Sequence, residues 1–278
     1  MKTGMSIGFI DYYLDEWHAN RYPRLIEEKS RGDMRVTLAY GHIDSPIGGR
    51  TTEQWCSDMN IRRAASIDEV CEECDAIIVL SPDNCEMHEL LCQKPLRTGK
   101  RVYVDKTFAP DYETAKRIFG VAEEYGTPCY STSALRFAEE YRGIGPVDAL
   151  ASWGPYAFET YAIHQLEPVM MLMRAKPEKL CCLPGRKSYT MLMAFPDGRA
   201  ASVTGFEAGM PFTMNLMSNG ENRMITVRSD YFGGFITNLV RFFDTGEGAV
   251  PHGETLNIMA ARGAGVKALS RPGEWIRT

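Results

Sequence analysis

The chain has 278 residues, of which 44% are hydrophobic and 24% charged, a composition typical of globular proteins at a length that favours two domains over one core. Its formal net charge of −5 argues against a nucleic-acid partner, because neutralising phosphates requires a basic surface. The apolar runs are strand-sized and the N-terminus lacks the apolar core of a signal peptide, so we expect neither a membrane protein nor a secreted one. Eight cysteines are too sparse for a disulfide scaffold, and we expect a protein of the reducing cytoplasm.

The first half of the chain alternates apolar runs of strand length with segments of helical period. This alternation is typical of a parallel sheet with crossover helices. Strands are predicted over 5–10, 35–40, 61–65, 76–80, 101–104 and 128–131, and helices over 16–29, 52–59, 67–73, 85–97 and 111–125. The prediction for residues 1–132 is therefore a Rossmann-like, doubly wound α/β domain of the dinucleotide-binding type.

The second half has a different rhythm. Hairpin signals stand at Pro196-Asp197-Gly198 and at Asn219-Gly220, which favours neighbouring antiparallel strands. Helices are expected over 136–142, 160–173, 232–245 and 255–270, and strands over 188–195, 200–206, 213–218 and 223–228. Residues 133–278 are therefore predicted to form an α+β domain with a mostly antiparallel open sheet.

Two cysteine pairs have spacings that occur in metal or redox sites. Cys71 and Cys74 are two residues apart, but no second pair or histidine cluster completes a zinc site. Cys181 and Cys182 are adjacent and lie in an expected strand. We interpret both pairs as buried structural thiols and predict no metal.

The turn after the first strand is where a doubly wound domain usually binds a diphosphate, because glycines let the backbone approach it and the helix N-terminus stabilises it. Here Asp11, Tyr13 and Glu16 hold the expected glycine positions, with Asp15 adjacent. Two negative charges about 5 Å apart at a dielectric constant near 20 repel by roughly 3 kcal/mol. The acids are expected to cancel much of the phosphate affinity. Asp15 can also simply cap the first helix, which is compatible with a lost phosphate site.

The end of the second strand also departs from a dinucleotide site. An acidic residue is expected there for the adenosine ribose, but Tyr40-Gly41-His42 stands in its place. Asp44 stays open as a substitute.

Two segments then carry a family pattern. The segment 75–84, followed by His88-Glu89, is similar to D-x-V-x-I-x-T-P-N-x-x-H-x-E, and 99–107 is similar to G-K-H-V-x-x-E-K-P. Together they resemble the Gfo/Idh/MocA oxidoreductases, the relatives of glucose-fructose oxidoreductase and inositol dehydrogenase, roughly over residues 5–145. The resemblance implies NAD or NADP as cofactor, although the acidic turn after the first strand leaves open that no cofactor binds. The implied cofactor-binding residues are Ser81, Pro82, Asn84, Asp105, Asp11 and Tyr13.

The resemblance also implies a catalytic lysine. Lys106 falls on the family lysine that sits at the nicotinamide and holds the reacting hydroxyl. Its neighbours differ, with Asp105 for glutamate and Thr107 for proline. A cis peptide costs about 0.5–1 kcal/mol before proline but about 2.5–4 kcal/mol before other residues, so we expect no cis bond before Thr107. A solvated lysine after a strand is the alternative.

A second catalytic position is implied by the helix over 160–173. Its sequence resembles D-x-x-x-H-x-x-D, with Thr160, His164 and Glu167 at the three marked positions. Helical spacing places these side chains on one face. The resemblance implies that His164 takes the hydroxyl proton. Thr160 can orient the imidazole but cannot stabilise its charged form as a carboxylate does, and a merely packed histidine is the alternative.

Two functional hypotheses follow. The first is a Gfo/Idh/MocA-like oxidoreductase of a sugar, cyclitol or related polyol, with atypical or weakened NAD(P) binding. The second is a non-catalytic relative that binds a carbohydrate-like ligand or a partner subunit. The resemblance also implies that the domain over residues 133–278 serves substrate binding or oligomerisation, with a homo-oligomer formed through the C-terminal sheet. The methionine-rich strands 191–193 and 210–217 would suit an interface, with core packing as the alternative.

Overall fold

The chain forms two compact units in the computed structural model, which describes residues 4–278. Unit 1 comprises the chain through Ala109, Glu113–Thr132 and Ile236–Pro251, and unit 2 comprises Pro110–Tyr112, Ser133–Phe235 and His252–Thr278. The segment Ile236–Pro251 thus returns to unit 1 long after the predicted boundary at residue 132. Residues 1–3, part of the N-terminal segment for which no signal peptide is expected, lie outside the described residues.

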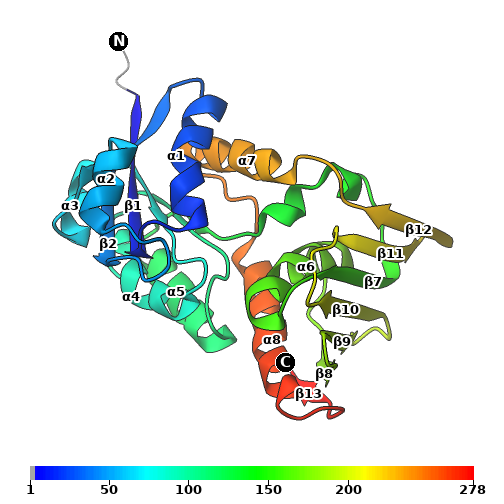
Figure 1. Ribbon diagram of the computed structural model, residues 1–278. Coiled ribbons are helices and arrows are strands. Elements are labelled where there is room, and N and C mark those ends of the chain that lie inside the picture. Colours follow the sequence, from blue (N-terminus) through cyan, green and yellow to red (C-terminus); the bar gives the residue numbers. More distant parts are fainter. Residues whose placement is uncertain (1–3) are drawn as a thin grey trace. The chain divides into compact units, whose positions relative to one another are not determined.

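Unit 1 is built on a parallel sheet with the strand order β3-β2-β1-β4-β5-β6, in which β1 and β2 lie side by side (Figure 1). The strands are β1 (Met5–Tyr13), β2 (Met34–Ile43), β3 (Arg62–Arg63), β4 (Ala76–Val79), β5 (Arg101–Val104) and β6 (Cys129–Tyr130). All four side chains of β4 are buried, as expected for a central parallel strand covered on both faces. The order reverses between β1 and β4, which confirms the predicted doubly wound fold.

The helices of this half are α1 (Trp17–Lys29), α2 (Thr52–Met59), α3 (Ile67–Glu73), α4 (His88–Cys92) and α5 (Tyr112–Glu124). The single helix predicted over 85–97 is wrong. Short 3₁₀ turns at Cys85–Met87 and Pro95–Arg97 flank α4 instead, because Pro95 lacks the N–H that would continue a helix.

The C-terminus of α3 is closed by a lysine. Lys100 Nζ donates to the carbonyl oxygens of Cys71 at 2.5 Å, Glu72 at 3.2 Å and Cys74 at 2.6 Å, which satisfies the last carbonyls of the helix. Burial raises the pKa of the Cys71 and Cys74 thiols to about 11. Both are therefore protonated at neutral pH and are poor nucleophiles.

Unit 2 contains a seven-stranded sheet with the order β12-β11-β7-β10-β9-β8-β13. The strands are β7 (Val147–Pro155), β8 (Lys179–Pro184), β9 (Ser188–Ala194), β10 (Ala200–Phe206), β11 (Thr213–Ser218), β12 (Glu221–Thr226) and β13 (Ile276–Arg277). The pair β7–β10 is parallel and the other pairs are antiparallel. This confirms the predicted mostly antiparallel sheet.

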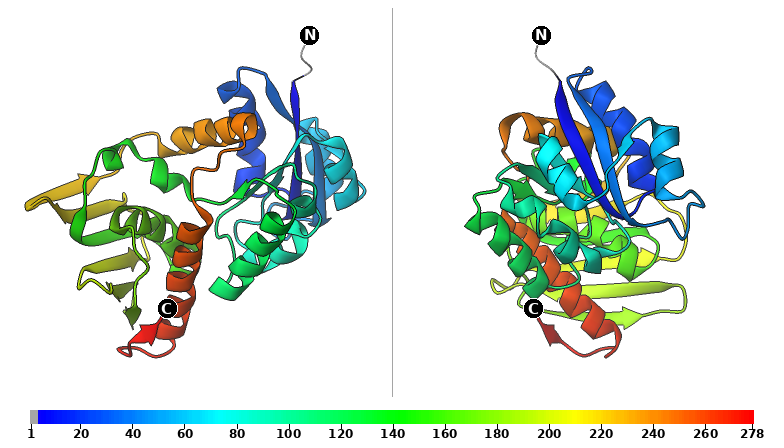
Figure 2. Two further views of the ribbon diagram at one scale, coloured as in Figure 1. Left: turned by 180° about the vertical axis from the view of Figure 1, so that it is seen from behind. Right: turned by 90° about the vertical axis from the view of Figure 1, so that its left-hand side faces the viewer.

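Two helices pack on this sheet. The first is α6 (Phe158–Met173), which contacts β7 and β10, and the second is α8 (His252–Leu269), which contacts β8 (Figure 2). A third helix, α7 (Tyr231–Thr245), begins in unit 2 and continues in unit 1. The helix predicted over 136–142 is wrong, since two 3₁₀ turns, Ala134–Phe137 and Glu139–Tyr141, stand there.

Most methionines of the C-terminal sheet belong to the core. Met191, Met193 and Met214 are at most 1% exposed, so the core-packing alternative holds for them. Met217 is 46% exposed and lies on the opposite face.

Candidate functional site

The predicted cofactor residues of unit 1 meet at the carboxyl edge of its sheet. Ile10 is in register with Val79, and Val79 with Val104. Since the residues after these positions share one edge, Asp11, Ser81 and Asp105 come together there. Ser81 Oγ donates to Asp11 Oδ1 at 2.9 Å and accepts from the Tyr12 N–H at 2.9 Å.

The first helix begins with a carboxylate of its own. Glu16 is the N-cap of α1, and its side chain accepts from the His18 N–H at 2.7 Å and from the Ala19 N–H. The side chain is buried, and this burial raises the pKa of Glu16. The interpretation of Asp15 as the cap was therefore wrong by one residue.

Asp15 instead anchors the loop that follows β2. It adopts a left-handed conformation with φ of 64°, and its carboxylate accepts from the Arg50 guanidinium, from the Arg50 N–H at 3.2 Å and from Asn20 Nδ2 at 3.1 Å. Hydrogen bonding to Arg50 lowers the pKa of Asp15. Asp15 is thus an ionised partner of Arg50.

The remaining cofactor candidates have local roles. Tyr13 is buried, which raises its pKa to about 12. Asn84 Nδ2 donates to Glu86 at 2.9 Å, and Pro82 is half-buried beside it. Asp44, left open as a ribose ligand, accepts from the Thr52 N–H at 2.7 Å and so binds the first turn of α2.

Asp11 is a buried carboxyl group that is only partly satisfied. Among the described residues, its Oδ2 is buried without a hydrogen-bond partner. Burial and the charge of Glu16 raise the pKa of Asp11 well above its ordinary value of 3.8. We infer that Asp11 holds its proton in the folded state beyond the pH at which an exposed aspartate ionises.

We expect Asp11→Asn to stabilise the protein at neutral pH. Because the folded pKa of Asp11 is raised, the folded wild type binds more protons than the unfolded chain above pH 3.8, and its stability falls as the pH rises toward the folded pKa. The asparagine variant lacks this loss, which is about 1.4 kcal/mol per pH unit. Urea unfolding of both proteins at acid and neutral pH measures the difference. Parallel stability curves for the two proteins would contradict the assignment.

Asp105 is the best-connected carboxylate at this edge. It is fully buried, pairs with His18 Nδ1, and accepts from the Lys106 N–H at 2.8 Å and from Tyr103 Oη at 3.2 Å. Burial by itself raises the pKa of Asp105, but the His18 and Lys106 charges outweigh it and lower the pKa. His18 also stacks on Tyr22 with ring centroids 5.1 Å apart.

Lys106 and the residue after it differ from the expectation. The peptide bond between Lys106 and Thr107 is cis, so the prediction of a trans bond was wrong. That prediction used only the intrinsic preference of an isolated peptide bond, whereas both residues are buried, Lys106 being 9% and Thr107 4% exposed. The alternative of a solvated lysine after a strand does not hold.

Two of the predicted residues of α6, His164 and Glu167, lie in a hydrogen-bonded group within unit 2. Ser133 Oγ lies 2.7 Å from His164 Nδ1, and the Ser133 N–H donates to Glu167 Oε1 at 3.1 Å. Arg136 Nε donates to Glu167 Oε2 at 2.9 Å. Glu167 is buried and Thr160 exposed. The structure thus brings His164 and Glu167 together through Ser133, and a role for Thr160 stays a prediction.

Several residues of these groups were not predicted from the sequence. Each of them lies far along the chain from its partner: Ser133 is 31 positions from His164, Arg50 is 35 positions from Asp15, and His18 is 87 positions from Asp105. No local spacing in the sequence indicates such pairs. For His18, the one available signal was the i, i+4 spacing to Tyr22.

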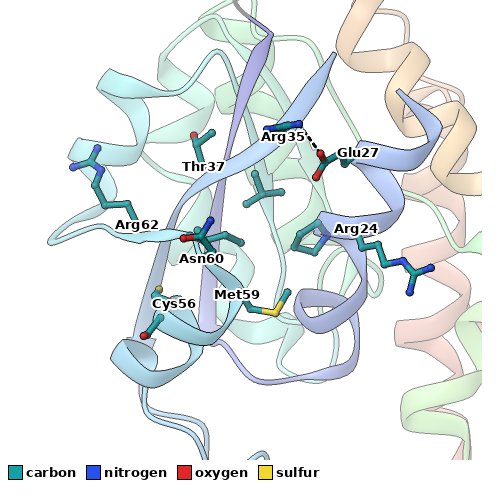
Figure 3. A pocket seen from close by; sticks show the side chains of 12 residues that line it. Arg24, Glu27, Arg35, Thr37, Cys56, Met59, Asn60 and Arg62 are labelled. Atoms are coloured by element: carbon teal, nitrogen blue, oxygen red, sulfur yellow. Dashed lines mark ion pairs between the residues drawn. The ribbon is translucent and has the colours of Figure 1, made fainter. Parts of the chain in front are cut away.

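A groove of about 800 Å³ lies elsewhere in unit 1, formed by α1, the end of α2 and the start of β2 (Figure 3). Its arginines are already paired: Arg24 with Glu28, Arg35 with Glu27, and Arg62 with Glu69. None of the predicted site residues lines it. The groove is therefore separate from the candidate site. Among residues 4–278, no cluster of three histidine, cysteine or acidic side chains could hold a metal, and no helix is long and apolar enough to cross a membrane.

Comparison with known proteins agrees with the family resemblance. Residues 46–133 match the model of the Gfo/Idh/MocA oxidoreductase family, described as having an NAD-binding Rossmann fold. This range includes β4, Ser81 and the Asp105–Lys106 turn, so the predicted resemblance is confirmed. No curated protein matches the chain in sequence.

Solved structures share the fold over nearly the whole chain. Myo-inositol 2-dehydrogenase from Lactobacillus plantarum superposes with a TM-score of 0.80 at 13% identity, covering 99% of both chains. Scyllo-inositol dehydrogenase from Lactobacillus casei with bound NAD(H) and scyllo-inositol gives 0.78 at 13%, covering 99% of both chains. UDP-N-acetylglucosamine 3-dehydrogenase GnnA from Acidithiobacillus ferrooxidans gives 0.76 at 13%, covering 97% of this chain and 98% of that one.

The diphosphate of the family cofactor does not fit the first turn as it is built here. The N-terminal amides of α1, which would bind a diphosphate, already donate hydrogen bonds to Glu16. Asp11 and Asp15 belong to the same turn. The nearby cation, Arg50, is engaged by Asp15.

Proposed function

We propose that the protein is a Gfo/Idh/MocA-type oxidoreductase that acts on a sugar, cyclitol or related polyol and binds a nicotinamide dinucleotide weakly. The observation that carries the proposal is the family match over residues 46–133, which contains the Asp105–Lys106 turn. Relatives of the same fold are named as dehydrogenases of inositols and of a nucleotide sugar. The closed first turn supports weak rather than tight cofactor binding.

Two residues carry the proposed chemistry. The Lys106 ammonium has three N–H donors and no acceptor, which suits it to hold a substrate hydroxyl or carbonyl oxygen. His164 takes the hydroxyl proton during oxidation and returns it during reduction. When His164 donates its Nδ1–H to Ser133 Oγ, its Nε2 carries the lone pair that accepts the proton. Glu167 fixes Ser133 through the backbone N–H, and Thr160 and Glu167 complete the family pattern.

Cofactor titration followed by a substrate panel tests the proposal. We expect fluorescence or calorimetric titration with NAD(H) and NADP(H) to give saturable binding near 1 mM, roughly −4 kcal/mol. With inositols and simple sugars as substrates, Lys106→Met and His164→Ala should abolish cofactor reduction. Lys116→Met, an exposed lysine of α5, should leave it unchanged.

A second candidate function is a non-catalytic relative that binds a carbohydrate-like ligand or a partner subunit. The Glu16 cap favours it, because a chain without a dinucleotide has no use for open amides at this turn. If no cofactor binding is detected at several times 1 mM, the binding free energy is weaker than about −4 kcal/mol. This result would reject the oxidoreductase and favour this alternative.

We also propose a homo-oligomer formed through the open face of the unit 2 sheet. On four neighbouring strands the side chains of this face are uncharged: Ala149, Ala151 and Trp153; Thr190, Leu192 and Ala194; Ala200, Ser202, Thr204 and Phe206; Thr213, Asn215 and Met217. Leu192 is 40% and Phe206 38% exposed. A second copy of the same neutral face needs no complementary charge pattern, so a symmetric pairing fits it.

The oligomer is tested by placing a charge in the middle of this face. We expect the wild type to elute with a mass above the 31.2 kDa of one chain in light scattering, and Ser202→Arg to shift it toward the monomer, because an unpaired buried charge opposes association. Glu124→Arg, on an exposed position of α5, should leave the mass unchanged. A monomeric wild type would reject the proposal.

The compartment is proposed to be the reducing cytoplasm. The eight cysteines are thiols rather than disulfides, which agrees with the scarcity of disulfides in that compartment. Fractionation of cells that produce the protein from its own promoter would test this, with recovery in an oxidising compartment as the contrary result.

A further inference from the structure

The amides at the start of α1 are already satisfied by an anion that belongs to the chain. The Glu16 carboxylate accepts from the N–H groups of His18 and Ala19, and the residue is 4% exposed. A helix N-terminus binds phosphate through these same orphan N–H groups. A cofactor diphosphate and the Glu16 side chain therefore compete for one set of donors.

The residues around Glu16 hold it in this position. Asp15, directly before it, is fixed by Arg50 and by Asn20. Ser45 Oγ donates to the Asp15 carbonyl oxygen at 3.2 Å, and a side chain at Gly48 would collide with the Asp15 carboxylate. The loop after β2 thus packs directly on the turn, and the backbone leading into the cap is braced on that side.

The charges nearby oppose an incoming diphosphate. Asp105 is fully buried, ionised and close enough to Glu16 for their charges to interact, and Asp11 adds a second buried carboxyl group beside them. The Arg50 guanidinium, the cation bound to this turn, already donates to Asp15 and to Asn20 Oδ1 at 2.7 Å. A diphosphate would therefore meet acidic groups together with a guanidinium whose charge is already neutralised.

We propose that Glu16 is an internal competitor of the cofactor diphosphate, which occupies the phosphate-binding amides of α1 and sets the affinity of unit 1 for dinucleotides. This inference deepens the proposed function and rests on it for the identity of the ligand. The weak binding of dinucleotides then depends on one side chain that a substitution can remove, since the first turn retains the backbone donors of a dinucleotide domain.

Glu16→Gly removes the competitor, and Glu16→Gln keeps its shape without its charge. The probe is inorganic pyrophosphate, measured by calorimetry on the full chain, because it reports the amides without requiring a nicotinamide site. We expect Glu16→Gly to bind pyrophosphate at least about tenfold more tightly than the wild type, and Glu16→Gln to lie between them. Glu53→Gly, which changes the same residue type in the first turn of α2, should bind as the wild type does.

Circular dichroism and thermal unfolding establish that each variant is folded, and Glu16→Ser, which retains a capping hydroxyl, replaces Glu16→Gly in the same comparison if the glycine variant unfolds. A folded variant with no gain in pyrophosphate affinity would overturn the inference. A gain for pyrophosphate and for NAD(H) together supports both the inference and the proposed function. A gain for pyrophosphate with no NAD(H) binding supports the inference but contradicts the proposed function.

Discussion

Replacing Asp105 by asparagine is expected to lower the free energy of unfolding by about 3–5 kcal/mol, the usual effect of removing one member of a buried charge pair. The carboxylate is fully buried and pairs with His18, while Lys106 and Tyr103 donate to its other oxygen. An amide presents one acceptor oxygen instead of two and carries no charge, so Lys106 loses its counter-charge and His18 loses a hydrogen bond to a carboxylate.

The pH dependence of this effect has a defined sign. Because the pKa of Asp105 is lowered from 3.8, its stabilisation is present above the ordinary value and is lost as the pH falls through the folded pKa. Urea unfolding should therefore show a large deficit for Asp105→Asn at neutral pH that shrinks below pH 3.8. Asp33→Asn, at an exposed position of unit 1, is the control, and equal stability of the two variants would refute the role of Asp105.

The second large effect is expected in unit 2, where Arg136→Met should cost about 3–5 kcal/mol. The Arg136 side chain, which is 9% exposed, lies between Glu167 and Glu254 and donates to both. The Glu167 side chain is only 4% exposed, so loss of the guanidinium leaves a buried carboxylate without its cation. We expect the double variant Arg136→Met/Glu167→Gln to recover part of the loss, since no buried charge then remains at that position.

An exposed arginine provides the matched control for this experiment. Arg142 pairs with Glu139 at 3.5 Å, and both side chains are exposed, so Arg142→Met should change stability by no more than about 1 kcal/mol. Chemical unfolding of the three variants measures the contrast. If Arg136→Met and Arg142→Met lower the free energy of unfolding by similar amounts, the ion pairs of Arg136 contribute no more to stability than an exposed pair does.

The sequence predicts the doubly wound half well because its signals are local and strong. The run 76–80 is continuously apolar and β-branched, and it forms the central strand β4. The helix boundaries of α2 and α3 agree with the prediction, since Thr51 and Ser66 are favourable N-cap residues whose side chains accept from the backbone N–H groups of the first turn. The strand β7 was missed, because the sequence VDALASWGP is poor in β-branched residues and its pairing partners lie far along the chain.

The sequence predicts which residues belong to the candidate site but not which of them contact one another. The absence of glycine and the excess of acids at residues 11–16 are visible in the sequence, and so are Lys106 and His164. That Glu16 rather than Asp15 caps α1 depends on the left-handed conformation of Asp15. This conformation is fixed by Arg50, which is 35 residues away. Contacts of this kind are set by tertiary packing, so no local spacing reveals them.

The most direct measurement of the central claim follows the backbone amides of His18 and Ala19 by NMR in the wild-type protein during a pyrophosphate titration. Glu16 bonds both amides in the closed turn, so we predict that their signals stay in place up to about 1 mM pyrophosphate, a binding free energy weaker than roughly −4 kcal/mol. In the same titration the Glu16→Gly protein should show both signals moving and saturating. Saturable shifts of these two amides in the wild type at micromolar pyrophosphate would contradict the account.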